Sequence, residues 1–476
     1  KQPMLKFVKI DRDMPLKRDA DDRRDDFDEI YAEYADAKAK EQASRCSQCG
    51  VPYCQSHCPL HNNIPDWLRL TAEGRLREAY EVSQATNTFP EICGRICPQD
   101  RLCEGNCVIE QSGHGTVTIG AVEKYITDTA WEEGWVKPIE PMVERSESVG
   151  IIGAGPGGLA AADVLRRAGV QVTIYDRYDR AGGLMIYGIP GFKLEKDVVM
   201  RRNDQLEQGG VTFRLNCNVG EDISFDDIRS AHDAVIIATG VYQSRDLAMP
   251  GSGVQGIEKA IDFLTASNRT GFGDVVADFA SGRLDAKGKR VVVIGGGDTA
   301  MDCVRTSIRQ GATSVKCLYR RDRANMPGSQ REVKNAEEEG VVFEWLSAPR
   351  GFVGDDIVTG VMVQKMRLGA PDASGRQAPE VIEGADYVED ADLVIKALGF
   401  EPEGLPVLWD QPDLTVTRWG TVKAQFTTGA TELDGVYAVG DIVRGASLVV
   451  WAIRDGRDCA DAILKRFSVP ATLAAE

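Results

Sequence analysis

Ser148-Val-Gly-Ile-Ile-Gly-Ala-Gly-Pro-Gly-Gly-Leu159 and, about 140 residues later, Arg290-Val-Val-Val-Ile-Gly-Gly-Gly-Asp-Thr-Ala300 are two versions of one pattern. Each begins with a short apolar run that predicts a buried strand and ends in a glycine-rich turn that opens a helix of small residues. Such a turn is typical of dinucleotide-binding β–α–β units, because the helix N–H groups there face a pyrophosphate. We therefore predict an α/β protein with two Rossmann-like dinucleotide-binding domains.

The domain organisation follows from the segments around these two turns. Further short apolar runs predict strands at 171–175, 234–238, 314–319, 393–397 and 436–439. Strands that alternate with helices indicate parallel sheets with helices on their faces. We expect a mostly helical N-terminal domain over 1–145, including a helical stretch over 65–84. The first dinucleotide domain should comprise 146–285 and 405–476, and the second should be inserted as 286–404.

Composition and charge limit the class of protein. The chain has 476 residues, 43% hydrophobic, and a formal net charge of −17. That charge argues against nucleic acid as a partner, because phosphates repel an acidic surface. No stretch approaches the roughly 18 uninterrupted apolar residues of a membrane span, and residues 1–28 contain no apolar signal core. We therefore expect a cytoplasmic protein without a membrane partner.

The first glycine turn belongs to a set of features in a particular order. Asp176 ends the next predicted strand, where a carboxylate can bind ribose hydroxyls. After Asp176 the chain contains Gly182-Gly183-Leu184, then Thr239-Gly240, and near the C-terminus Gly440-Asp441. Glycine motifs in this order resemble those of the two-dinucleotide-binding flavoproteins, in which the Gly-Asp near the C-terminus contacts the flavin cofactor. In that family the acidic residue is usually Glu, so Asp176 is a departure. The resemblance implies FAD, with these residues at its site: Gly153, Ala154, Gly155, Pro156, Gly158, Asp176, Gly182, Gly183, Leu184, Thr239, Gly240, Gly440 and Asp441.

After the second glycine turn, the next predicted strand ends in basic residues and not in a carboxylate. Two arginines, Arg320 and Arg321, stand where a ribose-binding carboxylate would be expected. Guanidinium groups fit a 2′-phosphate, so the site is predicted to prefer NADPH. The alternative is that these arginines form surface ion pairs. The predicted NADPH residues are Gly295, Gly296, Gly297, Asp298, Thr299, Arg320, Arg321 and Gly399.

The N-terminal region is rich in cysteine. Eight of the twelve cysteines fall between Cys46 and Cys107, beginning with Cys46-x2-Cys49-x4-Cys54-x3-Cys58-Pro. This run is close to the ferredoxin pattern, in which the cysteine before proline ligates a second iron–sulfur cluster. Zinc is the alternative, although its sites usually consist of two separated Cys-x2–4-Cys pairs. By simple count, eight cysteines would serve two 4Fe–4S clusters. The other four cysteines are expected to be small buried hydrophobes.

Nearly the whole chain resembles one family. The cysteine-rich N-terminus, the run Gly182-Gly-Leu-Met-Ile-Tyr-Gly-Ile-Pro-Gly-Phe-Lys-Leu194 and the run Arg320-Arg-Asp-Arg-Ala-Asn-Met-Pro-Gly328 look like the small (β) subunits of bacterial NADPH-dependent glutamate synthase. The electron-input half of dihydropyrimidine dehydrogenase is similar in layout. The resemblance implies that one 4Fe–4S cluster is held by Cys46, Cys49, Cys54 and Cys107. The other is implied to take Cys58, Cys97, Cys103 and an eighth ligand, for which Glu123 is favoured over Cys93.

The resemblance also implies a function. NADPH would transfer a hydride to FAD, and single electrons would then pass through the clusters to a large (α) subunit that carries FMN and makes L-glutamate from L-glutamine and 2-oxoglutarate. No catalytic acid or base is expected in this chain. One alternative is an electron-input subunit of the same build that passes electrons to ferredoxin or to another dehydrogenase. A dithiol reductase is another alternative, but it needs a Cys-x-x-Cys beside the flavin, and Cys46–Cys49 lies far upstream.

Overall fold

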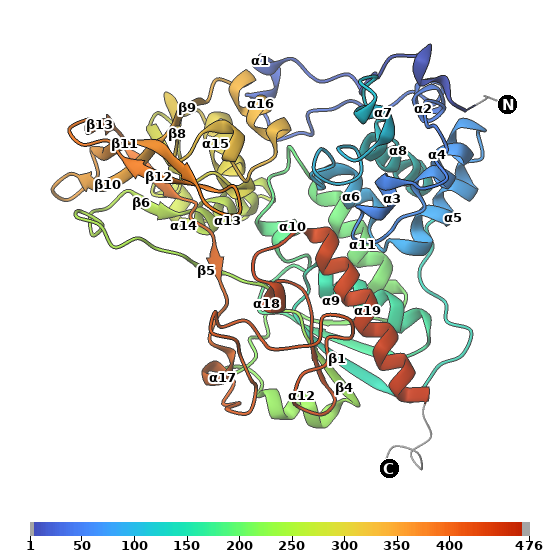
Figure 1. Cartoon of the computed structure of the whole chain (residues 1–476). Coiled ribbons are helices and arrows are strands. Elements are labelled where there is room, and N and C mark those ends of the chain that lie inside the picture. Colours follow the sequence, from blue (N-terminus) through green and yellow to red (C-terminus); the bar gives the residue numbers. More distant parts are fainter. Residues whose placement is uncertain (1–3, 469–476) are drawn as a thin grey trace.

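The structure is a computed structural model that describes residues 4–468. Residues 1–3 and 469–476, which the predicted first and last domains include, lie outside the described residues. Three units are visible in Figure 1: a helical N-terminal unit in blue, a unit in yellow and orange, and a unit that joins green segments to the red C-terminal helix. Among the described residues, no helix is both long and apolar enough to cross a membrane.

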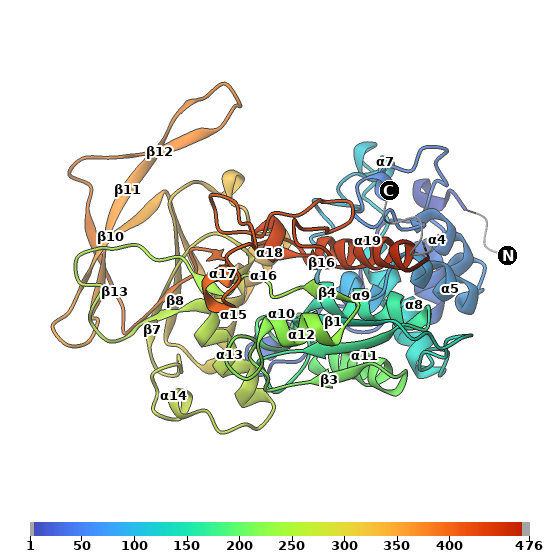
Figure 2. The same ribbon diagram turned by 90° about the horizontal axis from the view of Figure 1, so that it is seen from below.

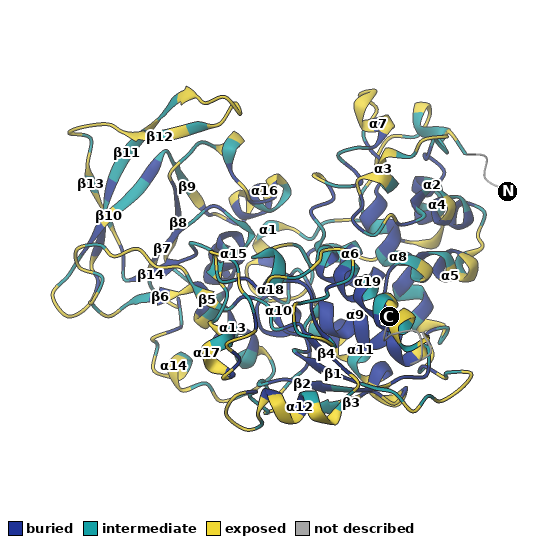
Figure 3. Ribbon diagram, turned by 60° about the horizontal axis from the view of Figure 1, so that its bottom comes forward, coloured by how far each residue is buried: buried dark blue, intermediate teal, exposed yellow. Residues whose placement is uncertain are grey.

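The first parallel sheet is built around the first glycine turn. Its strand order is β16-β4-β1-β2-β3, and β1 pairs in register with both β2 and β4. The central strand β1 is almost entirely buried, and helix α19 packs along α9 on one face of the sheet (Figures 1 and 3). The elements of this unit are β1 (Ser148–Ile152), α9 (Pro156–Arg167), β2 (Gln171–Tyr175), α10 (Leu184–Tyr187), α11 (Lys196–Gln208), β3 (Thr212–Arg214), α12 (Phe225–Ala231), β4 (Ala234–Ile237), α17 (Leu405–Leu408), β16 (Val436–Ala438), α18 (Asp441–Arg444) and α19 (Val449–Ser468).

The second parallel sheet is built around the second glycine turn, in the order β6-β14-β7-β8-β9. The chain enters and leaves this unit through a two-stranded antiparallel pair, β5 with β15. The elements of this unit are β5 (Gln243–Ser244), β6 (Ile257–Lys259), α13 (Ala260–Gly271), α14 (Ala277–Ala280), β7 (Arg290–Ile294), α15 (Asp298–Gln310), β8 (Ser314–Tyr319), η2 (Arg323–Asn325), α16 (Gln330–Glu338), β9 (Val342–Trp345), β14 (Leu393–Lys396) and β15 (Phe400–Glu401).

The boundary between the two dinucleotide units lies earlier than residue 286, the position predicted from the sequence. Strand β6 pairs with β14 in the second sheet, with Ile257 opposite Val394. Helix α13 packs against α15 of the same unit. Strand β6 is only three residues long and no glycine turn follows it. Residues 257–285, predicted to belong to the first dinucleotide unit, therefore belong to the second.

An antiparallel layer that the strand–helix alternation did not predict projects from the second unit. It consists of β10 (Ser347–Val353), β11 (Gly360–Pro371), β12 (Gln377–Val381) and β13 (Tyr387–Asp390). Strand β11 pairs with each of the other three. Figure 2 shows the β11–β12 hairpin extending away from the rest of the molecule.

The N-terminal unit is helical, as predicted. The helical stretch expected over 65–84 is two helices, because Gly74 adopts a φ of 77° between them. Trp67 and Leu68 lie in the core between these helices. The elements of this unit are η1 (Lys6–Val8), α1 (Ala20–Arg23), α2 (Asp36–Ala43), α3 (Tyr53–Ser56), α4 (Ile64–Ala72), α5 (Leu76–Thr86), α6 (Pro90–Ile96), α7 (Val108–Gln111) and α8 (Ile119–Glu132).

A buried ion pair joins the helical unit to the first dinucleotide unit. Arg202 of α11 donates to both carboxylate oxygens of Glu91 of α6, at 2.8 and 3.0 Å. Both side chains are almost completely buried. Removing one member of such a pair strands the other charge in a medium of low dielectric constant.

We expect Arg202→Ala to cost about 3–5 kcal/mol of stability, because Glu91 would remain buried without its cation. The matched control is Arg77→Ala, whose ion pair with Glu81 is exposed at 3.6 Å and should contribute little. Thermal unfolding of the two variants measures the difference. A melting temperature in Arg202→Ala that equals that of Arg77→Ala would contradict this expectation.

Candidate functional site

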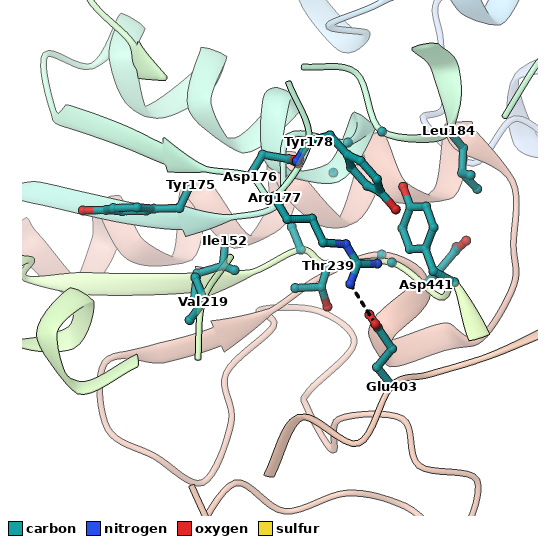
Figure 4. A pocket seen from close by; sticks show the side chains of 18 of the residues that line it. Ile152, Tyr175, Asp176, Arg177, Tyr178, Leu184, Val219, Thr239, Glu403 and Asp441 are labelled. Carbon is teal, nitrogen blue, oxygen red and sulfur yellow. Dashed lines mark hydrogen bonds and ion pairs between the residues drawn. The ribbon is translucent and has the colours of Figure 1, made fainter. Parts of the chain in front are cut away.

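A cavity of about 330 Å³ opens at the carboxyl ends of the strands in the first sheet. Parallel α/β sheets usually bind their ligands at this edge. Figure 4 shows the labelled side chains Arg177, Tyr178, Thr239, Glu403 and Asp441 around it. Ten of the thirteen residues predicted to contact FAD line the cavity: Gly153, Gly155, Pro156, Asp176, Gly183, Leu184, Thr239, Gly240, Gly440 and Asp441.

The other three predicted residues shape the turn and do not line the cavity. The Ala154 N–H donates to the Asp176 carboxylate at 2.7 Å, and the Gly182 N–H donates to the Ala154 carbonyl at 2.8 Å. A Cβ on Gly158 would lie 2.2 Å from the Gly153 carbonyl oxygen. Gly158 is therefore required for the close approach of α9 to the turn.

The cavity has features that fit a dinucleotide. The Thr239 hydroxyl is buried and has no hydrogen-bond partner among the described residues. A Cβ on Gly155 would meet no atom within 4 Å, so the backbone there is open toward the cavity. Burial raises the pKa of Asp441 to about 7. Unpaired buried polar groups are costly, so a polar ligand in this cavity would satisfy groups that the protein alone leaves unmatched.

Asp176 was predicted to bind ribose hydroxyls, but both oxygens of its carboxylate already accept hydrogen bonds from backbone N–H groups. One carboxylate oxygen accepts from the Ala154 N–H, and the other accepts from the Tyr178 N–H at 2.8 Å. Burial raises the pKa of Asp176 despite these bonds. Each oxygen can accept a further hydrogen bond, but the short side chain is held against the turn. A contact between Asp176 and ribose stays a prediction.

The structure adds cavity residues that the sequence did not indicate. Arg177 donates to Glu403 at 2.8 Å and lies 5.2 Å from the ring centroids of both Tyr178 and Tyr242. Figure 4 shows the Arg177–Glu403 pair, marked by a dashed line, among the side chains that line the cavity. Glu403 follows Arg177 by 226 positions, so no local pattern could have joined them. Cys217, expected to be a buried hydrophobe, is only half-buried and also lines the cavity.

The second glycine turn has a similar construction. A Cβ on Gly297 would meet no atom within 4 Å, whereas a Cβ on Gly296 would lie 2.4 Å from the Tyr319 ring. Asp298, the first residue of α15, accepts a hydrogen bond from the Ser329 N–H at 3.0 Å. Gly399 follows β14, so it lies at the same edge of the sheet as this turn.

Arg320 and Arg321 come directly after β8, beside this turn. Among the described residues, neither arginine forms an ion pair, whereas Arg323 pairs with Glu337 at 2.9 Å. The Arg321 Nε is buried without a hydrogen-bond partner. The alternative that these two arginines serve surface ion pairs therefore finds no support, and both guanidinium groups are available to an anionic ligand.

The cysteines of the helical unit form two groups. Cys46, Cys49, Cys54 and Cys107 line one small cavity, which is the set that the resemblance implied for one cluster. Burial raises the pKa of the Cys54 thiol to about 12. All twelve cysteines are free of disulfides. No three described His, Cys, Asp or Glu residues converge closely enough to hold a single metal ion.

The second group lies near the crossing of α6 and α8 and consists of Cys58, Cys93, Cys97 and Cys103 together with Glu123. A Cβ on Gly94 would lie 2.7 Å from the Lys124 backbone nitrogen, so only glycine permits this close crossing. Burial, and then the nearby Glu123 carboxylate, raise the pKa of the Cys58 thiol. Burial is also the largest cause of the raised pKa of Cys103, followed by Glu104, Cys58 and then Glu123. A hydrogen bond with Cys93 is the largest cause of the raised pKa of Cys97, so Cys93 belongs to this group as well.

Glu123 is not a surface carboxylate. Its side chain is buried and accepts a hydrogen bond from the Asn87 amide at 3.4 Å. Lys124, the cation next to it in the sequence, instead pairs with Asp128 at 3.0 Å. Burial raises the pKa of Glu123 to about 8. A buried carboxyl without a cation is costly, and a metal cluster would remove that cost.

Comparisons with known proteins define the class first. The family described as dihydropyrimidine dehydrogenase domain II, 4Fe–4S cluster, matches residues 23–135. The family described as pyridine nucleotide-disulphide oxidoreductase matches residues 147–456. The structure of Mycobacterium tuberculosis FprA in complex with NADPH has a TM-score of 0.57 at 22% identity, covering 68% of this chain and 85% of that chain. The chain is thus an oxidoreductase that joins a 4Fe–4S domain to an FAD- and NAD(P)-type unit.

The particular family follows from its relatives. The glutamate synthase (NADPH) small chain of Azospirillum brasilense is 66% identical over 97% of this chain and 96% of that protein. A longer Escherichia coli K12 protein, named only as an oxidoreductase, is 45% identical over 95% of this chain and 69% of that protein. This chain belongs to the family of glutamate synthase (NADPH) small chains. A small chain implies a large-subunit partner.

Proposed function

We propose that this chain is the electron-input subunit of a glutamate synthase. In this role it binds NADPH at the second glycine turn and FAD at the first, and it holds two 4Fe–4S clusters that lead to the large subunit. The observation that carries the proposal is the 66% identity to a glutamate synthase (NADPH) small chain over nearly the full length of both proteins. FAD can accept a hydride from NADPH and release electrons singly, which is the chemistry it would supply here.

The chain itself supplies binding and orientation. At the first site, the open face of Gly155 and the N-terminus of α9 are proposed to receive the pyrophosphate. The Thr239 hydroxyl and the Asp441 backbone and side chain are proposed to bind the flavin portion. The Arg177–Glu403 pair, which joins β2 to the returning chain before α17, is proposed to hold the cavity mouth closed over the cofactor.

At the second site, Gly297 and the N-terminus of α15 are proposed to bind the pyrophosphate of NADPH. Arg320 and Arg321 are proposed to bind its 2′-phosphate, which is supported by their lack of ion-pair partners among the described residues. Charge-assisted hydrogen bonds of this kind are the strong ones. No side chain is required as a general acid or base in hydride transfer.

In the helical unit, we assign one cluster to Cys46, Cys49, Cys54 and Cys107, and the other to Cys58, Cys97, Cys103 and Glu123. The first set is supported by the shared cavity. The second is supported by the burial of Glu123 without a cation. Cys93 is the alternative eighth ligand, since its thiol lies beside Cys97. Hydrophobic side chains surround Cys93, including Phe89 and Ile92, and this favours its role as a neutral core residue.

The downstream reaction belongs to the partner. We propose that electrons reach a large subunit that carries FMN and forms L-glutamate from L-glutamine and 2-oxoglutarate in the cytoplasm. The second candidate is an electron-input unit of another dehydrogenase, which is favoured by the 45% identity to the longer Escherichia coli oxidoreductase. A dithiol reductase is disfavoured, because Cys217 is the one cysteine among the described residues that line the first cavity.

Affinity purification of the tagged chain under anaerobic conditions from its own cells tests this proposal. A large FMN-containing chain should co-purify, and the complex should form glutamate from NADPH, glutamine and 2-oxoglutarate. The isolated chain, with the same cofactors, should oxidise NADPH with an artificial acceptor but form no glutamate. Co-purification of a different dehydrogenase, with no glutamate formed, would select the second candidate instead.

A further inference from the structure

The segment Met326–Arg331 lies between the second glycine turn and the loop that contains Cys97. It continues the run that begins with Arg320 and Arg321. Apart from the Ser329 N–H bond to Asp298, its residues take no part in the sites described above. Met326 and Ser329 are both 4% exposed. The segment is therefore an internal contact between two units and not a free surface loop.

On one side, the segment is bonded to the proposed pyrophosphate site of NADPH. The Gly328 N–H donates to the Gly296 carbonyl at 2.8 Å. The Ser329 N–H donates to the Asp298 carboxylate at 3.0 Å. A Cβ on Gly328 would lie 3.1 Å from the Gly296 carbonyl oxygen, so the two backbones are in close contact. If the glycine turn moves when a ligand binds, these two hydrogen bonds would transmit the movement to Gly328 and Ser329.

On the other side, the segment is bonded to the loop that follows Cys97. Arg101 donates to the carbonyls of Met326 and Gly328, at 3.3 and 2.9 Å. The Ser329 hydroxyl donates to the Asp100 carboxylate at 3.3 Å. These three bonds cross from the second dinucleotide unit to the helical unit. They join the glycine turn to Asp100 and Arg101, which lie in the chain between the proposed cluster ligands Cys97 and Cys103.

A fourth contact reaches the ligand residue itself. Arg331, in the first turn of α16, donates to the Cys97 carbonyl at 3.3 Å and to the Gln99 side chain at 2.5 Å. The Gln99 amide in turn donates to the Cys93 and Gly94 carbonyls, both at 3.1 Å. A cation and an ordered amide at the backbone of a ligand are the kind of surroundings that tune a cluster's potential.

We propose that Ser329 and Arg331 are positioning residues that couple NADP(H) binding to the 4Fe–4S cluster held by Cys97. This proposal rests on the proposed function, because it needs both ligands to be bound. Coupling between two sites is reciprocal, so the factor by which cluster reduction changes NADP⁺ affinity equals the factor by which NADP⁺ changes the reduction equilibrium. NADP⁺ brings negative phosphates toward a cluster whose reduction adds negative charge, so each should disfavour the other.

The test is a redox titration of the FAD- and cluster-loaded chain, followed by low-temperature EPR, with and without saturating NADP⁺. The signal altered by Cys97→Ser identifies the relevant cluster. We expect NADP⁺ to disfavour its reduction at least threefold, which at 59 mV per tenfold change is a shift of about 28 mV to lower potential. Because the readout is a potential, it does not depend on turnover.

The decisive variant is Ser329→Ala with Arg331→Met. It removes the side-chain hydrogen bonds to Asp100, Gln99 and the Cys97 carbonyl and keeps the Ser329 N–H bond to Asp298. The shift caused by NADP⁺ should be clearly smaller in it than in wild type, while FAD and iron contents stay at wild-type levels. A residual shift is expected, because the charge of NADP⁺ and the Arg101 bonds to the segment remain. Arg323→Ala is the matched control, because Arg323 lies in the same run but pairs with Glu337; it should retain the shift. If the double variant loses iron, Ser329→Ala alone should still reduce the shift.

Two results would overturn the coupling: a wild-type potential that NADP⁺ leaves unchanged, or an equal shift in wild type and in the double variant. Failure of the proposed function would look different. In that case the wild-type chain would bind no NADP⁺ or carry no EPR-active cluster, and no titration of the kind described could be recorded.

Discussion

Glu123→Ala is expected to leave one of the two clusters with three thiolate ligands and an exposed iron. The purified variant should lose iron readily, and the EPR spectrum of the dithionite-reduced protein should lack an intact second cluster. At saturating NADPH the flavin should still be reduced, because hydride transfer involves the dinucleotide sites and not Glu123. Iron content and EPR measure the damage directly.

The physical reason lies in the surroundings of Glu123. Its carboxyl is buried and, among the described residues, has no cation beside it; burial raises its pKa to about 8. A metal ligand must be deprotonated, so cluster binding would release the proton of this carboxyl and gain an oxygen ligand. Alanine provides neither charge nor lone pair. A carboxylate is also a harder ligand than a thiolate, so its loss should shift the potential of any cluster that remains.

Cys93→Ala is the matched control. Cys93 is the alternative eighth ligand, but it is packed among apolar side chains such as Ile92. If Glu123 is the ligand, the cysteine variant should retain both clusters and lose only a small amount of packing energy. Two intact clusters in Glu123→Ala, together with one damaged cluster in Cys93→Ala, would assign the eighth position to Cys93.

The double variant Arg320→Ala/Arg321→Ala is expected to lose its preference for NADPH over NADH. Each guanidinium contact with a phosphate contributes about 1.5–3 kcal/mol, so the two together should change the preference roughly a hundredfold or more. The change should appear mainly as a higher KM for NADPH, since the 2′-phosphate is distant from the hydride that is transferred. Steady-state kinetics with both coenzymes and an artificial acceptor measure it.

Arg323→Ala should keep the preference for NADPH, because its side chain pairs with Glu337 and Gln330 within its own unit. An NADPH-to-NADH ratio in the double variant that equals the ratio of wild type would refute the assignment of Arg320 and Arg321.

The architecture of the two sheets was accessible from the sequence because local patterns encode it. The apolar runs that begin at Ser148 and Arg290 predict strands, and β1 and β7 begin at these two residues. Each owes its clarity to an apolar run followed at once by a glycine turn. The three-residue strand β6 has no such signal, and its pairing with β14 depends on a residue far away in the chain. That is why the predicted boundary at 286 was too late.

The candidate site likewise contains residues that local motifs indicate and residues that depend on contacts between distant parts of the chain. Glycines, Thr239 and Asp441 could be found from short motifs, and they line the first cavity. The Arg177–Glu403 pair could not, because it depends on how the returning chain packs over the cavity. Glu123 is an intermediate case. The resemblance to known proteins could suggest its position. Its burial without a cation depends on tertiary packing, and the sequence alone would instead indicate an ion pair with the neighbouring Lys124, which in the structure pairs with Asp128.

The most direct test of the account is a reductive titration of the purified chain in the absence of oxygen, with FAD and iron counted in the same sample. The account predicts one FAD and iron for two 4Fe–4S clusters per chain. NADPH should bleach the flavin absorbance, and dithionite should deliver two electrons to the flavin and one to each cluster. A flavin that NADPH does not bleach, or iron for only one cluster, would contradict it.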